Sequence, residues 1–435
     1  MGCAGRWDYI KNAEHSDFLT SNQGGIMTPV IRKTALTLLS GFILLLFVMP
    51  RPVAAETKEP CLPPEGATIK LSETAFMRLN YQMQFYAESR DTGSGVDGTK
   101  QTTDFYFRRN RLSLTGQASE VVGYSVKIEQ SGPRSIGPVD VAEEPVSDFD
   151  VLESYLTADL DDSFRLVIGK SKIPFTREVL EGCFTPLTLD RSLFIATPMA
   201  RTRDLGFVAW GSLAHDKLQY FAAVQEGQET TNAPESAPRY TGRVHIALLD
   251  PEKTFGYGGT YLGNKMILTV GAGAQYEPGA VYSDVTAKTG EKNYSAWTAD
   301  VFMEYPVGIS GSATLSGAYV KTSFDKAYQG SNPDPESVGI DGEKKGWYAK
   351  AGYLFIDKIG PGQIQPFLRY EEWNFALLNG VYAQEITWMA GGLNYLINGQ
   401  NLRLTLQYAV TDFKDEENAA SQDFKTITAM LQAQF

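Results

Sequence analysis

The last twelve residues, FKTITAMLQAQF at 424–435, alternate between apolar and polar side chains up to an aromatic carboxy-terminus. The apolar face of the strand they predict consists of Ile427, Ala429, Leu431, Ala433 and Phe435. The polar face consists of Thr426, Thr428, Gln432 and Gln434, with Met430 as its one apolar member. A strand that ends a chain leaves an open sheet edge, whereas a closed barrel pairs its last strand with its first. This segment alone fits a barrel and the edge strand of a soluble sandwich equally well.

The same alternation recurs from residue 75 onward. Between Ala75 and Ala87 every second side chain is apolar or aromatic, and polar side chains at 78, 80, 82 and 84 face the other way. This run exceeds the ~5–6 residues usual in soluble strands and suits a tilted strand that crosses a bilayer. Predicted strands occupy 75–87, 104–116, 124–130, 151–160, 164–170, 204–213, 218–226, 239–249, 265–277, 293–305, 312–324, 345–356, 364–375, 384–397, 402–413 and 424–435. Segment 250–264 contains four glycines and is interpreted as an extended turn, although it could also hold a strand.

Sixteen strands make an even number, and short turns alternate with long connections between them. The chain has 22 Tyr and 23 Phe, many near predicted strand ends, as the aromatic girdles of a barrel require. The expected fold class is therefore all-β: a transmembrane antiparallel β-barrel of about 16 strands over residues 74–435. The alternative, a large secreted sandwich or repeat protein, would have to account for sixteen lipid-compatible strands.

The first 55 residues are interpreted as a leader. Arg32 and Lys33 precede an apolar run over 35–49, and small residues follow at 53–55, as in a secretory signal peptide cleaved after Ala55. Met27 is the expected start of the signal peptide at 27–55, so residues 1–26 are interpreted as an over-long start. Residues 56–73 form a short lead into the barrel. Export to the outer membrane of a Gram-negative bacterium is the expected localisation.

Composition excludes several function classes. The leader holds five basic and three acidic residues, so the remaining chain has 34 basic and 48 acidic residues, a net charge of −14 that does not favour nucleic-acid binding. Cys61 and Cys183 can form at most one disulfide. His215 and His245 have no evident nucleophile beside them, and no haem, zinc or phosphate-loop motif occurs. We therefore expect no enzyme, no cofactor and no metal site. The acidic loops 131–150 and 412–423 are interpreted as a solvated outer face.

Sixteen strands is the size class that leaves a water-filled channel, in which charged side chains set selectivity. The long segment 171–203 and its flanks form the strongest basic region of the chain. Its cations are Lys170, Lys172, Arg177, Arg191, Arg201 and Arg203, against Glu178, Glu181, Asp190 and Asp204. Because it also carries apolar stretches, it is expected to fold into the lumen as a constriction loop. The alternative is a loop packed outside, against the barrel rim or a neighbouring subunit.

Two predicted strands add cations on faces that would point into the lumen. One carries Arg239 and Arg243, with Thr241 between them, and the other carries Arg109 and Arg111. The alternation of the second strand slips at a possible β-bulge, so either Arg108 or Arg109 could point inward. Both sets could instead stiffen the wall through salt bridges.

With these residues in place, the chain resembles the phosphate-selective porin O and P family. The resemblance is sharpest at 107–116 (FRRNRLSLTG), 168–178 (IGKSKIPFTRE), 187–192 (LTLDRS) and 203–211 (RDLGFVAWG). It implies a homotrimeric sixteen-stranded barrel with an inward constriction loop, matching segment 171–203. Phosphate-specific members carry an arginine ladder down one wall, for which Arg239 and Arg243 are the nearest counterpart here. Phosphate specificity is therefore less well supported than the fold.

The function expected from these features is passive diffusion of small hydrophilic solutes through an outer-membrane porin with a modest preference for anions, phosphate among them. Phe435 would serve as a signal to the outer-membrane assembly machinery. An alternative from a different class is a barrel that sheathes a partner protein, such as a multihaem cytochrome in an electron conduit.

Overall fold

The computed structural model describes residues 66–130, 149–192, 194–228 and 232–435. The predicted leader and its signal peptide lie outside these residues. Cys61, the lead up to residue 65 and most of the acidic loop 131–150 also lie outside them. Within the predicted lead, β1 (Ala67–Lys70) pairs with the first long strand.

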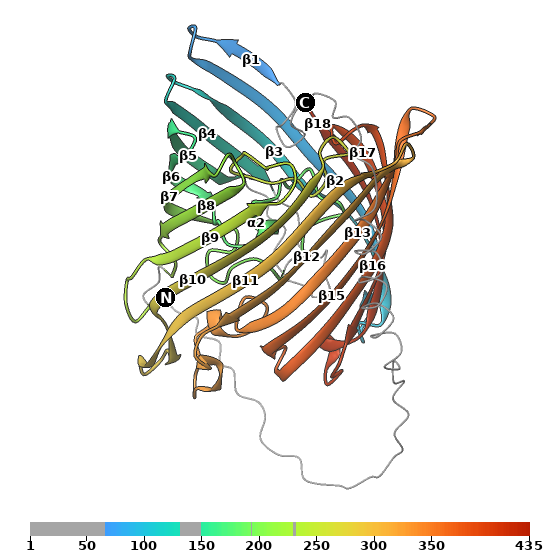
Figure 1. Ribbon diagram of the computed structural model, residues 1–435. Coiled ribbons are helices and arrows are strands. Elements are labelled where there is room, and N and C mark those ends of the chain that lie inside the picture. The colour runs from blue at the N-terminus through green and yellow to red at the C-terminus, as the bar shows by residue number, and fades with distance from the viewer. Residues whose placement is uncertain (1–65, 131–148, 193, 229–231) are drawn as a thin grey trace, which may run out of the picture. The chain divides into compact units, whose positions relative to one another are not determined.

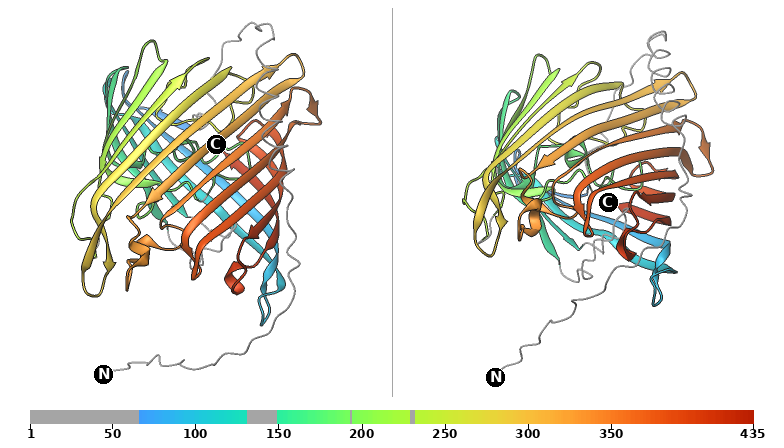
Figure 2. Two further views of the ribbon diagram at one scale, coloured as in Figure 1. Left: turned by 60° about the horizontal axis from the view of Figure 1, so that its bottom comes forward. Right: turned by 90° about the horizontal axis from the view of Figure 1, so that it is seen from below.

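Sixteen long strands in the described residues form one closed antiparallel sheet (Figure 1, Figure 2). They are β2 (Phe76–Ser94), β3 (Lys100–Gln117), β4 (Val122–Gln130), β5 (Asp150–Asp161), β6 (Phe164–Lys172), β7 (Arg203–Leu213), β8 (Leu218–Gln225), β9 (Arg239–Ala247), β10 (Ile267–Asp284), β11 (Thr289–Val307), β12 (Gly311–Ser323), β13 (Lys344–Phe355), β15 (Gly362–Leu378), β16 (Val381–Asn398), β17 (Leu402–Phe413) and β18 (Phe424–Gln434). Each pairs with its neighbour along the chain, and β18 pairs with β2 to close the ring. The predicted barrel and its strand number are confirmed.

Shorter elements lie between these strands. They are α2 (Arg177–Leu180), β14 (Lys358–Ile359), and the 3-10 turns η2 (Ala327–Gln329), η3 (Pro335–Ser337) and η4 (Ala419–Ser421). Among the described residues, no helix combines the length and apolar character that a membrane span requires.

The seam between the first and last long strands follows the predicted alternation. Gln82 and Gln84 point inward and donate to Gln434 and Gln432, with Nε2–Oε1 distances of 2.8 and 2.7 Å. The outward residues Ile427, Ala429 and Leu431 of β18 are exposed and Ala433 is half-buried. Met430 is buried against Leu189 of the long segment after β6. Met430, an apolar residue on the polar face of β18, therefore has an internal packing partner.

Three predicted loops were wrong. The loop predicted at 89–103 shrinks to 95–99, because β2 and β3 extend into it. The loop predicted at 278–292 belongs to β10 and β11, which leave only residues 285–288 as a turn, and the loop predicted at 376–383 shrinks to 379–380. Strands beyond the bilayer meet water on their outer face, so they lose the apolar alternation but keep their hydrogen-bonded ladder. Alternation therefore predicts the lipid-facing part of a strand and misses its extension.

Candidate functional site

The segment between β6 and β7, residues 173–202, lies inside the barrel and is called the inserted segment below (Figure 1). Thr176 caps its single helical turn, since its hydroxyl accepts from the Val179 amide at 3.1 Å. The ring of Phe194 packs on Trp373 and Phe375 of β15, at centroid distances of 5.3 and 5.2 Å. Of the two positions expected for this segment, the structure has the one inside the barrel.

Polar side chains of the inner wall satisfy backbone carbonyls of the inserted segment. Asn394 Nδ2 donates to the Leu187 carbonyl at 2.8 Å, and Arg403 Nη1 donates to the Pro186 carbonyl at 2.9 Å. Gln432 Nε2 reaches the Phe184 carbonyl at 2.9 Å. A buried irregular backbone needs such partners, so these contacts fix the inserted segment against β16, β17 and β18.

The predicted extended turn 250–264 also packs inside the barrel and is called the inner turn. It holds no strand of the sheet, as expected, but Glu252, Tyr257 and Tyr261 are buried. The buried Glu304 of β11 accepts from four groups: the amides of Tyr261 and Gly263 and the hydroxyls of Thr260 and Thr314, at 2.7–3.0 Å. The glycine-rich composition predicted the turn but not its inward position.

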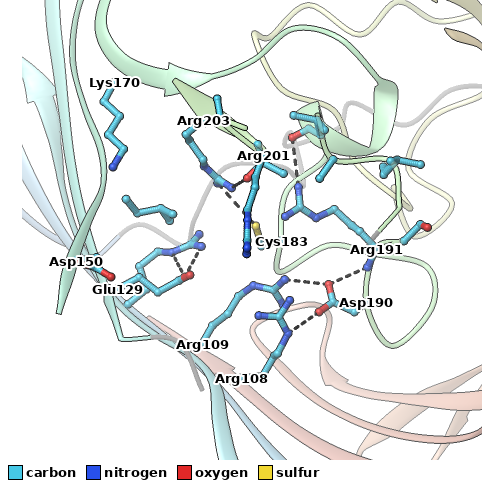
Figure 3. Close-up of a pocket in the computed structure, with 18 of the residues that line it drawn as sticks. Arg108, Arg109, Glu129, Asp150, Lys170, Cys183, Asp190, Arg191, Arg201 and Arg203 are labelled. Atoms are coloured by element: carbon cyan, nitrogen blue, oxygen red, sulfur yellow. Dashed lines mark hydrogen bonds and ion pairs between the residues drawn. The ribbon is translucent and has the colours of Figure 1, made fainter. Parts of the chain in front are cut away.

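A cavity of about 540 Å³ lies between the inserted segment and the wall formed by β3–β7, and we call it the basic cavity (Figure 3). Its cationic lining consists of Arg108, Arg109, Arg111, Lys170, Arg191, Arg201 and Arg203. Its carboxylates are Glu129, Asp150 and Asp190. The lining therefore carries a formal excess of four positive charges.

The β-bulge considered at Arg108 resolves the orientation of the two neighbouring arginines. Gln84 pairs with Arg109 while Phe85 pairs with Phe107, so Arg108 is the extra residue. Both guanidinium groups are buried, and both bind Asp190, Arg108 Nε at 2.9 Å and Arg109 Nη2 at 2.9 Å (Figure 3). The bulge thus turns two consecutive arginines toward one carboxylate.

Burial would raise the pKa of Asp190, but Arg109 and Arg108 outweigh it and hold that pKa well below its ordinary value. Arg111 Nε binds Glu129 at 2.8 Å, and Arg203 Nη2 binds Glu153 at 2.8 Å. These carboxylates neutralise part of the cationic lining and hold those side chains against the wall.

Arg191 is bound differently from the other arginines. Its Nη1 donates to the carbonyls of Glu178 and Val179 at 3.1 and 3.3 Å, and it forms no ion pair with a carboxylate of the described residues. Arg201 Nη2 lies 3.5 Å from Asp341, and Lys170 donates to the Val151 carbonyl at 2.9 Å. Arg191 is thus a cation of the basic cavity that lacks a carboxylate ion-pair partner among the described residues.

Four of the predicted cations lie away from the basic cavity. Lys172 donates to the carbonyls of Leu180 and Glu181, and Arg177 forms a buried bidentate pair with Glu252. Arg239 binds Glu277 at 2.8 Å, and Arg243 binds Asp300 at 2.7 and 2.9 Å. For Arg239 and Arg243 the structure has the stiffening salt bridges that were the alternative. None of the four lines the basic cavity.

Sequence reasoning missed the carboxylates that organise this cavity. Glu129 lies directly opposite Arg111 in the β3–β4 hairpin. Since a short turn joins those strands, counting residues from the turn would have found this pair. Glu153 meets Arg203 across two intervening elements, and no local signal predicts that contact.

Glu181 offers a test of how the inserted segment is held. Its carboxylate is buried, accepts no hydrogen bond from the described residues, and lies 3.5 Å from Arg177 Nε. Burial outweighs the neighbouring cations and raises the pKa of Glu181 from 4.5 to about 7. Between pH 4.5 and about 7 the folded protein therefore keeps a proton on Glu181 that the unfolded chain has released. The free energy of unfolding should consequently fall as the pH rises from about 4.5 to about 7.

Glu181→Gln should therefore raise the thermal unfolding midpoint in detergent at pH 8 and change it little at pH 5. Glu120→Gln, at an exposed turn, is the matched control and should leave both midpoints unchanged. Equal midpoint changes at the two pH values for Glu181→Gln would contradict the raised pKa.

The comparisons with known proteins agree with the barrel fold. The sequence model of the family described as phosphate-selective porin O and P matches residues 77–435. An uncharacterised protein of Aquifex aeolicus (strain VF5) is 24% identical over 340 residues, which cover 73% of this chain and 78% of that protein. The outer-membrane channel DcaP of Acinetobacter baumannii has a similar fold, with a TM-score of 0.54 at 15% identity over 84% of this chain and 99% of that chain. An anion-selective porin from Comamonas acidovorans has a TM-score of 0.52 at 12% identity, covering 83% of this chain and all of that one.

Proposed function

We propose, on the premise that this chain belongs to the phosphate-selective porin O and P family, that it passes small hydrophilic solutes across the outer membrane with a modest preference for anions. The family and the closed barrel support a channel rather than an enzyme. The observation that carries the anion preference is the basic cavity, in which seven cations face three carboxylates.

The physical chemistry of the basic cavity favours anions over cations. Guanidinium and ammonium groups in a narrow aqueous passage replace part of the hydration shell of an anion, and a low-dielectric wall strengthens their field. Arginine can also hold phosphate or carboxylate through two hydrogen bonds. Because Asp190, Glu129 and the nearby Glu153 occupy several arginines, we expect weak selectivity rather than tight binding.

The test is the reversal potential of purified protein in a planar bilayer under a salt gradient. The double variant Lys170→Gln and Arg191→Gln removes two cations whose described hydrogen-bond partners are backbone carbonyls, so little else should change. Its reversal potential should move toward cation preference, and more so at low salt, since the Debye length grows from ~10 Å at 0.1 M to ~30 Å at 0.01 M.

The matched control removes two exposed cations elsewhere, Lys326→Gln and Lys358→Gln, and should keep the wild-type value. If the cavity double variant also keeps the wild-type reversal potential at low salt, the basic cavity does not set selectivity.

The proposal also covers export of the chain and assembly of the barrel. We infer a homotrimer from the family resemblance, exported by the signal peptide over 27–55. Phe435 is exposed, its ring lies 5.4 Å from that of Tyr81, and its backbone bonds to Tyr81 in both directions. A terminal aromatic side chain that faces outward is available to the assembly machinery.

The sheath for a partner protein is not proposed. The inserted segment and the inner turn occupy the barrel interior through buried contacts to the wall. A partner protein would have to displace both, and no feature of the described residues favours that exchange.

A further inference from the structure

The basic cavity is followed by a second cavity, of about 240 Å³, which we call the inner chamber. Three residues line both cavities: Arg111 of β3, Cys183 of the inserted segment and Arg203 of β7. The inner chamber is bounded further on by Gln82 and Gln434 of the seam and by Thr254 to Tyr257 of the inner turn. The two cavities are therefore adjacent, and those three residues stand at their junction.

The inner chamber continues the positive charge of the basic cavity. Its lining includes the cations Arg111, Lys127, Lys172 and Arg203 against the single carboxylate Glu153. An anion that enters the basic cavity therefore meets a positive lining on both sides of the junction.

Buried contacts bind the two inserted elements to the walls away from β3–β7. Toward β15–β18, the inserted segment is bound by Asn394, Arg403 and Gln432, and Phe194 packs on β15. Toward β11, the inner turn is bound to Glu304. Both inserted elements are thus bound to those walls, and the two cavities lie on the other side, toward β3–β7.

The junction lies between side chains of the barrel wall and Cys183 of the inserted segment. Arg111 and Arg203 are held to the wall by Glu129 and Glu153. Cys183 faces them from the inserted segment, with Sγ 3.9 Å from Arg203 Nη2 (Figure 3). Its thiol is small, so the width of the passage at this point depends on the side chain at position 183.

We infer that solutes cross the barrel off its axis, through the basic cavity and the inner chamber in series, with Arg111, Cys183 and Arg203 forming the neck between them. This inference deepens the proposed function and rests on it. It assigns to Cys183 the position at which added bulk blocks conduction.

The experiment uses anionic 2-sulfonatoethyl methanethiosulfonate on protein in which Cys3 and Cys61 are replaced by Ser. The Cys183 thiolate attacks the sulfenyl sulfur, a mixed disulfide forms, and methanesulfinate leaves with the electron pair of the broken S–S bond. Conductance in a planar bilayer should fall by about twofold or more, because a charged group of several atoms then occupies the neck. Cys183→Ser should keep its own starting conductance when the reagent is added, because it has no thiol to label.

A cationic methanethiosulfonate should react with Cys183 more slowly than the anionic one, and the difference should shrink at high salt. Cys183→Trp supplies the same bulk without labelling and should also lower conductance, provided that heat-modifiability confirms a folded barrel.

Complete labelling by mass with unchanged conductance would overturn the inference. Absence of labelling would overturn it as well, since a path that carries solutes must admit a reagent of similar size. These results are distinguishable from failure of the proposed function. If the Cys183 adduct blocks conduction but the pore shows no ion selectivity, the path is supported and the anion preference is wrong. If the pore is selective but the adduct does not change its conductance, the anion preference is supported and the path is wrong.

Discussion

Arg177→Ala should lower the free energy of unfolding by about 3–5 kcal/mol, the usual cost of leaving one member of a buried ion pair alone. Arg177 Nη1 and Nη2 bind the two oxygens of Glu252 at 2.7 and 2.8 Å, and both side chains are fully buried. The guanidinium also lies 3.9 Å from the ring centroid of Phe302, which adds a cation–π contact. This pair joins the inserted segment to the inner turn, so both elements should loosen together.

The loss of Arg177 should also change how stability depends on pH, through the ionisation of Glu252. Burial would raise the pKa of Glu252, but Arg177 outweighs burial and holds it well below its ordinary value. The pair therefore contributes stability above the unfolded pKa of ~4.3, and that contribution is lost as the pH falls. In Arg177→Ala the stability difference from wild type should accordingly be largest near neutral pH and shrink in acid.

The measurements are the heat-modifiability midpoint in detergent and protease cleavage between β6 and β7. Arg165→Ala is the control, because its partner Asp162 is exposed and such surface pairs contribute ~0–1 kcal/mol. The double variant Arg177→Met with Glu252→Gln removes both charges and should recover much of the loss. A midpoint for Arg177→Ala equal to that of Arg165→Ala would mean that this pair does not hold the two inserted elements together.

Asp190→Asn should both destabilise the inserted segment and strengthen the preference for anions. The carboxylate binds Arg108 and Arg109, and its Oδ1 accepts from the Arg191 amide at 2.7 Å. A neutral amide leaves two buried guanidinium groups without their counter-charge, at a cost of about 3–5 kcal/mol. It also raises the formal charge excess of the basic cavity by one.

The reversal potential of Asp190→Asn should move opposite to that of the Lys170 and Arg191 double variant. Because Asp190 has a lowered pKa, its stabilising contribution is present above the unfolded pKa of ~3.9 and disappears below it, so the variant should lose less in acid than at pH 7. Asp341→Asn, next to the partly exposed Arg201, is the matched control and should show a small effect on both readouts. A shift of Asp190→Asn toward cations would contradict the assignment of the basic cavity.

The alternation of apolar and polar side chains predicted the barrel because it reflects the two environments on either side of the barrel wall. A wall residue faces lipid or the lumen, and the two alternate along each strand, so the pattern is local and readable in Ala75–Ala87 or in β18. The same reasoning failed at 278–292, where strands continue beyond the bilayer without an apolar face.

For the basic cavity, six of the ten predicted cations were brought together, namely Lys170, Arg191, Arg201, Arg203, Arg109 and Arg111. Local composition was enough to identify these cations as candidates, because the family motifs and the excess of basic residues lie in continuous stretches of sequence. It could not separate them from Arg239 or Arg243, whose inward positions on β9 were correctly predicted but which bind Glu277 and Asp300 away from the basic cavity.

The sequence by itself determined the closed sixteen-stranded barrel, the inward faces of its strands and the stretch that enters the lumen, since each depends on neighbouring residues and on the bilayer. Only the tertiary structure decided which cations remain able to act on a solute. Arg177 binds Glu252, 75 residues away, and Arg243 binds Asp300, 57 residues away. Within the part of the chain that the structure describes, the guanidinium of Arg191 binds backbone carbonyls. The strength of a charge depends on its partner and its solvent, and both are set by contacts between segments far apart in the chain.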